Sequence, residues 1–61
     1  MQKFYVNYSV DLGDKVMAMQ AGPFTSGECA EQHRDDIKGY AGVSKCWIGE
    51  TRDPERQLIS A

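Results

Sequence analysis

Hydrophobic and polar residues alternate strongly at the start of the chain, with Tyr5 as the aromatic exception among the polar positions. From residue 3 to residue 10 every second side chain is Phe, Val or Tyr, a period typical of a half-buried β-strand. The residues of its apolar face are Phe4, Val6, Tyr8 and Val10. Asp11 to Asp14 have the composition of a turn, so residues 15–21 are expected to return antiparallel as the second arm of a hairpin.

The pattern changes to that of a helix after Gly22-Pro23. Thr25 and Glu28 have the spacing of a capping box, in which each side chain bonds to the backbone N–H of the other residue. We therefore expect a helix from about Ser26 to Lys38, ended by Gly39. Its thin apolar stripe consists of Ala30, His33 and Ile37, with Cys29 beside it.

A third alternating segment, residues 43–48, predicts a strand with Cys46 and Ile48 toward the helix. The elements together predict a small single-domain α+β fold in the order ββαβ. It has a three-stranded, mainly antiparallel sheet with one helix packed on one face. Residues 1–50 would form this mini-domain. Residues 51–61 are expected as a polar C-terminal tail, or as a short helical turn that begins at Asp53-Pro54.

Composition and charge narrow the function classes. The chain is 41% hydrophobic and 26% charged, which is typical of a folded protein. The net charge is −2 and the basic residues are scattered, so no nucleic-acid partner is expected. No apolar run has the length of a signal peptide or a membrane span, so we expect no membrane partner and a cytoplasmic location.

The two cysteines, Cys29 and Cys46, are expected as buried thiols, without a metal site or a cofactor. Cys29 and His33 lie one helical turn apart, so Cys29 could act as a nucleophile with His33 as its base. A small thiol enzyme is therefore an alternative function. No third residue is evident to orient the imidazole, so His33 is interpreted as a helix-boundary residue. The expectation is therefore a protein that is not an enzyme.

One helix can cover only one face of a sheet, which leaves the other face open for association. Tyr5 and Trp47 point to this open face, and the second strand adds either its even-numbered or its odd-numbered residues, depending on register. The candidate binding residues are Tyr5, Met17, Met19 and Trp47. The sequence thus favours a non-catalytic module that binds a larger protein or forms a homodimer through this face, with an exposed strand edge as the competing site. A phage- or prophage-type accessory protein that modulates a host protein suits a chain of this size.

Residues 20–30, Gln-Ala-Gly-Pro-Phe-Thr-Ser-Gly-Glu-Cys-Ala, resemble the Q-x-G-x-F-x-S-x-x-x-A segment of sporulation-related repeat (SPOR) domains. Ile37 also stands where that family keeps an apolar helix residue. The resemblance implies a module that binds denuded peptidoglycan glycan strands across its sheet, with Tyr5 and Trp47 stacking on sugars. The chain departs from the family's βαββαβ order by having room for one helix, and His33 stands where Leu is usual.

Overall fold

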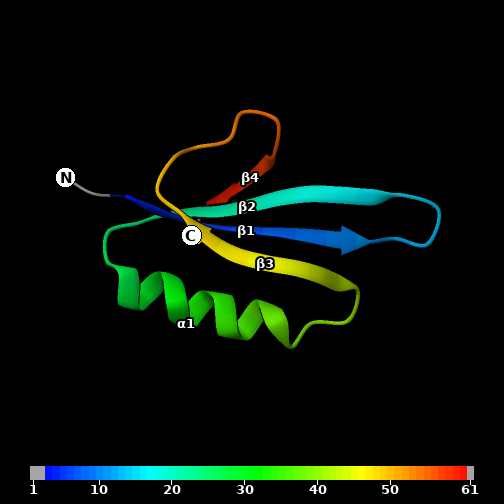
Figure 1. Cartoon of the computed structure of the whole chain (residues 1–61), viewed down its shortest axis with the longest axis horizontal. Coiled ribbons are helices and arrows are strands. Elements are labelled where there is room, and N and C mark those ends of the chain that lie inside the picture. The colour runs from blue at the N-terminus through cyan, green and yellow to red at the C-terminus, as the bar shows by residue number, and fades with distance from the viewer. Residues whose placement is uncertain (1–2, 61) are drawn as a thin grey trace.

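A hairpin of two long strands forms the centre of the sheet (Figure 1). The computed structural model describes residues 3–60. Its elements are β1 (Phe4–Asp11), β2 (Val16–Phe24), α1 (Gly27–Lys38), β3 (Val43–Gly49) and β4 (Gln57–Ser60). The hairpin turn is closed by a hydrogen bond from the backbone N–H of Gly13 to Asp11 Oδ1 at 2.8 Å, with Gly13 at φ 93°. The predicted hairpin is therefore confirmed.

The sheet has the strand order β3-β1-β2-β4. β1 is antiparallel to both of its neighbours, whereas β4 lies parallel to β2. The α+β class and the single helix packed on the sheet are as predicted, but the sheet has four strands and is mixed. Residues 51–60 were expected as a polar tail or a helical turn. Residues 51–56 instead belong to the connection between β3 and β4, and Gln57–Ser60 form the fourth strand.

The register of the hairpin decides which side chains of β2 face the helix. Tyr8 pairs with Met19 and Val10 pairs with Met17, and residues directly opposite each other share a face. Tyr8 and Val10 belong to the apolar side of β1, so both methionines lie on the helix side. The expectation that they join the open face is wrong. The buried core on the helix side comprises Val6, Tyr8, Ala21, Ala30 and Ile37.

The helix begins one residue later than the capping box predicts. Ser26 is the N-cap, with extended backbone at φ −132° and ψ 147°, and its Oγ accepts a hydrogen bond from Cys29 N at 3.1 Å. Thr25, the predicted cap, is exposed. The predicted end is confirmed, since α1 stops at Lys38 and Gly39 is the C-cap. Ser26 and Thr25 are both good caps by residue type, so only the backbone path distinguishes them.

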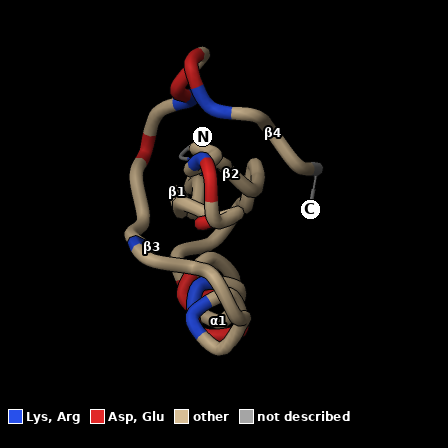
Figure 2. The backbone as a smooth tube through the Cα atoms, turned by 90° about the vertical axis from the view of Figure 1, so that its right-hand side faces the viewer, with Lys and Arg blue, Asp and Glu red and all other residues tan. Residues whose placement is uncertain are grey.

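The two crossing connections lie on opposite faces of the sheet (Figures 1 and 2). α1 joins β2 to β3 across one face. Residues 50–56 leave β3 at one edge and reach β4 at the other edge by crossing the second face. We call residues 50–60, which include β4, the strap. The face that the sequence leaves open is thus partly covered by the strap.

We predict that Ser26→Ala lowers the free energy of unfolding by about 1 kcal/mol, because the N–H of Cys29 loses its capping partner. In a domain of this size that is a fall of roughly 4–8 °C in Tm, measurable by thermal circular dichroism. Thr25→Ala is the matched control and should change Tm much less. A larger loss from Thr25→Ala than from Ser26→Ala would contradict the observed cap.

Candidate functional site: the strap, the covered face and the sheet edges

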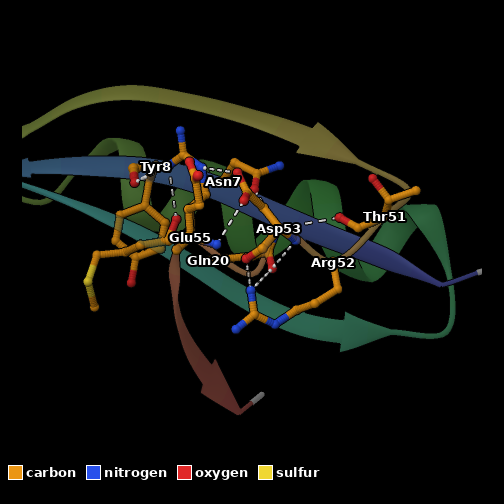
Figure 3. A network of polar contacts seen from close by, with 9 residues as sticks. Asn7, Tyr8, Gln20, Thr51, Arg52, Asp53 and Glu55 are labelled. Atoms are coloured by element: carbon orange, nitrogen blue, oxygen red, sulfur yellow. Dashed lines mark hydrogen bonds and ion pairs between the residues drawn. The ribbon is translucent and has the colours of Figure 1, made fainter.

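A buried glutamine joins the sheet to the strap (Figure 3). The Gln20 side chain is 0% exposed. Its Nε2 donates hydrogen bonds to Asn7 Oδ1 at 2.6 Å and to the Thr51 carbonyl at 3.5 Å. Its Oε1 accepts hydrogen bonds from Arg52 Nη1 at 3.0 Å and from Asp53 N at 3.2 Å. Three successive strap residues are therefore bound by one amide, which has no unused hydrogen-bonding capacity.

Arg56 fixes the strap at a second point. Its Nη1 donates hydrogen bonds to the backbone carbonyls of Tyr8 at 3.1 Å and Met19 at 3.4 Å, which lie on the two central strands. Its guanidinium carbon lies 4.7 Å from the centroid of the Trp47 ring, within the range of a cation–π contact. Within the strap, Arg56 Nε also forms an ion pair with Asp53 Oδ2 at 3.3 Å. Arg56 thus links β1, β2 and β3 from the strap side.

Asp53 shapes the strap itself. Its Oδ1 accepts a hydrogen bond from Glu55 N at 3.0 Å, and its carbonyl accepts hydrogen bonds from the Arg52 side chain and from Arg56 N. The bond to Glu55 N is of the kind that a helix cap makes, which explains why Asp53-Pro54 reads as a helix start. Here it forms only a turn, because the chain then enters β4.

Two glycines on the strands beside β1 let β1 side chains approach the neighbouring backbone closely. A Cβ at Gly49 would lie 2.9 Å from Asn7 Nδ2. A Cβ at Gly22, whose φ is +147°, would lie 2.8 Å from the Tyr5 ring and 3.0 Å from the Phe4 carbonyl. Tyr5 is consequently only 8% exposed. The expectation that Tyr5 is an exposed aromatic residue of an open face is wrong, although Tyr5 does lie on that face, with Asn7.

The four predicted binding residues do not form one surface. Met17 and Met19 lie on the helix side, and Tyr5 is buried on the strap side. Trp47 is 42% exposed on the strap side, and Arg56 covers part of its ring. Gln20 and Arg56 were not among the predicted binding residues. The available signal was a lone Gln inside a β-strand, which needs hydrogen-bond partners if it is buried.

Cys29 and His33 have different surroundings on α1. Cys29 is exposed, which corrects its predicted burial. The His33 ring packs against Phe24, with the ring centroids 5.0 Å apart and an interplanar angle of 45°. Among residues 3–60 no hydrogen bond joins the two side chains. His33 therefore serves as a packing residue at the edge of the helix–sheet interface.

Cys46 lies half-buried between β3 and the helix. Its Sγ donates a hydrogen bond to the Arg34 carbonyl at 3.7 Å. Burial raises the pKa of this thiol, and the positive charges of Lys38 and Arg34 oppose that rise only in part. Asp35 adds to the rise in pKa. Cys46 thus has the packing and protonation of a structural thiol.

Both edges of the sheet carry exposed side chains. The large hydrophobic residues that remain exposed in the described chain are Leu12, Val16, Tyr40, Trp47, Leu58 and Ile59. Leu58 and Ile59 are adjacent in β4, on opposite faces of the edge strand, and are 39% and 41% exposed. They are the only consecutive residues in this set. Their strand, β4, lies at the edge of the sheet and has one hydrogen-bonded neighbour, β2.

The described residues enclose no pocket. Within this part of the chain, no three His, Cys, Asp or Glu side chains gather in a group that could hold a metal ion. Residues 3–60 also contain no helix that is long and apolar enough to cross a membrane.

Comparisons with known proteins found no match. No family model matches the chain, and no match was found among curated proteins or solved structures. The glycan binding implied by the resemblance of residues 20–30 to SPOR domains therefore stays a prediction.

We predict that Gln20→Leu destabilises the fold, because Asn7 Oδ1, the Thr51 carbonyl and Asp53 N each lose a partner. The bond to Asn7 is buried, and a buried group left unpaired costs about 1–3 kcal/mol. Chemical denaturation measures the loss. The matched control is Gln32→Leu, the same exchange at an exposed helix position. Equal stability of the two variants would contradict the role assigned to Gln20.

We predict that iodoacetamide alkylates Cys29 faster than Cys46 at mildly alkaline pH. Cys29 is exposed, whereas Cys46 is half-buried and its raised pKa lowers the thiolate fraction. Mass spectrometry of Cys29→Ser and Cys46→Ser, which each retain one thiol, gives the two rates. Faster labelling of the thiol in Cys29→Ser than in Cys46→Ser would contradict the burial of Cys46.

Proposed function

We propose that this protein is a non-catalytic interaction module that binds an extended segment of a larger protein along the outer edge of β4. The observation that carries the proposal is the pair Leu58 and Ile59, which stay exposed on both faces of an edge strand. An unpaired edge offers a row of backbone donors and acceptors to an added strand.

The edge is favoured over the open face that the sequence suggests. The strap crosses that face, and Gln20, Asn7 and Tyr5 are buried there. Trp47 is the single large aromatic residue left exposed on it, and its ring already holds the Arg56 guanidinium. A partner docking flat on this face would have to displace polar contacts that are complete in the free chain.

β4 is favoured over β3, the other edge strand. β3 carries Lys45, which is exposed, and its pairing with β1 has a register shift in which Ser44 is the extra residue. Charges and bulges at an edge both oppose the addition of a further strand. β4 consists of Gln, Leu, Ile and Ser, has no charge, and pairs with β2 without a shift.

The partner's chemistry follows from the edge. Backbone hydrogen bonds supply most of the affinity for an added strand, and the side chains beside it supply the specificity. Leu58 pairs with Gln20 on the strap side, and Ile59 pairs with Ala21 on the helix side. An incoming segment would therefore place apolar residues beside both, at successive positions of its own strand.

The alternatives have less support. SPOR-like glycan binding needs aromatic rings open to stack on sugars, but Tyr5 is 8% exposed and Arg56 covers part of Trp47. A thiol enzyme needs a paired base, but the His33 ring packs on Phe24. A phage or prophage origin and a cytoplasmic location stay predictions from the sequence.

We predict that peptides selected from a displayed random library on the full-length chain lose affinity at least about tenfold for Leu58→Lys, since lysine at an edge blocks strand addition. Binding should also slow amide hydrogen exchange in residues 57–60. Leu12→Lys is the matched control, because Leu12 is 48% exposed at the hairpin turn, outside β4, and it should bind the peptides normally.

Circular dichroism would confirm that both variants are folded. Peptides that bind Leu58→Lys as tightly as the unmodified chain would overturn the proposal. Peptides whose binding is lost only in Trp47→Ala would instead indicate the strap face.

A further inference from the structure

We propose that the strap is an exchangeable segment, which seats on the strap face of a second copy of this chain and gives a two-fold strand-exchanged dimer. The proposal concerns the contacts between the strap and the sheet. It is therefore separate from strand addition at the outer edge of β4.

The body of the protein has its own core without the strap. The buried core cluster and the partly buried hydrophobic residues packed against it all belong to β1, β2, α1 and β3. The large hydrophobic residues of the strap, Leu58 and Ile59, stay exposed. Release of the strap therefore breaks the β2–β4 pairing, the hydrogen bonds of Gln20 and Arg56 between strap and sheet, and a cation–π contact, but leaves the helix-side apolar core closed. The ion pair between Asp53 and Arg56 lies within the strap and is kept.

The released site is complementary to this chain's own strap. Gln20 binds main-chain groups of Thr51 and Asp53, which many extended segments could supply. It also accepts from the Arg52 side chain, and Arg56 fills the position between Trp47 and the carbonyls of the central strands. Two arginines four positions apart, with Asp53 between them, are specific to the strap. The occupant that provides all of these groups is a second copy.

Exchange preserves every one of these contacts in the dimer. The free energies of monomer and dimer then differ only in the hinge, in any new surface buried between the copies, and in the entropy of association. The hinge lies where the strap leaves β3, at Gly49 and Glu50, and Glu50 is exposed. Trp47, two residues before the hinge and 42% exposed, would lie at the new interface and favour the dimer.

The test starts with the full-length chain, refolded from denaturant at high protein concentration and analysed by sedimentation velocity. We expect a dimer that dissociates slowly on dilution. A mixed dimer of ¹³C-labelled and unlabelled chains should then show intermolecular NMR contacts between the Gln20 side chain and residues 51–53. A chain that stays monomeric after this treatment would overturn the proposal.

Variants separate exchange from other modes of dimerisation. Gln20→Leu removes contacts that monomer and dimer share, so subunit exchange, followed by native mass spectrometry of labelled and unlabelled dimers, should accelerate on the order of tenfold. The dimer Kd should stay within about twofold, because shared contacts cancel. Arg52→Ala, which removes one bond to Gln20, gives the same readout if Gln20→Leu fails to fold.

Leu58→Lys distinguishes this proposal from edge pairing. Leu58 has the same surroundings in monomer and exchanged dimer, so the variant should dimerise as the unmodified chain does. Loss of the dimer in Leu58→Lys, or loss of dimer affinity in Gln20→Leu without faster exchange, would show that the copies associate in another way and would overturn strand exchange. Neither result depends on whether peptides bind at β4.

Discussion

The structure depends on one buried amide that must be satisfied. Gln20 sits at the centre of a sheet, on the face that the helix does not cover, and is 0% exposed. An amide in that position needs partners for two N–H groups and two lone pairs. A buried N–H or lone pair without a partner costs more free energy than the hydrogen bond contributes when it is present. Asn7 supplies one partner, and the strap supplies the others. This requirement accounts for the path of residues 50–56 across the sheet.

The two faces of the sheet are consequently stabilised by different kinds of interaction. The helix face is apolar and is stabilised by burial of side chains such as Val6, Ala21 and Ile37. The strap face is stabilised by directional contacts of Gln20 and Arg56, in which geometry matters more than area. A small domain can bury only a limited apolar area, and here a polar second layer extends the structure on the other face of the sheet.

Much of the fold could be predicted from local patterns. Alternation placed β1, β3 and the hairpin correctly, and the helix ends where Gly39 indicates, because these signals act over a few residues. The faces of Met17 and Met19 could not be predicted, since a shift of one residue in register reverses them. β4 was missed because its four residues, Gln-Leu-Ile-Ser, show no alternation, and because its pairing with β2 is decided by groups far away in the sequence. The predicted binding residues were wrong for a related reason. Which side chains are exposed together depends on contacts between parts of the chain that lie far apart in the sequence.

The direction of β4 has a consequence for how the chain folds. The Gln20–Asn7 bond closes a loop of 13 positions, whereas the bond from Arg56 to the Tyr8 carbonyl spans 48. The loss of chain entropy on closure grows with that separation, and a parallel strand cannot form as a local hairpin. Topology therefore favours early formation of the β1–β2 hairpin and late docking of β4. Until that last step the outer edge of β2 at residues 19–22, later paired with β4, is open, which makes folding the stage at which the chain is most exposed to wrong pairing.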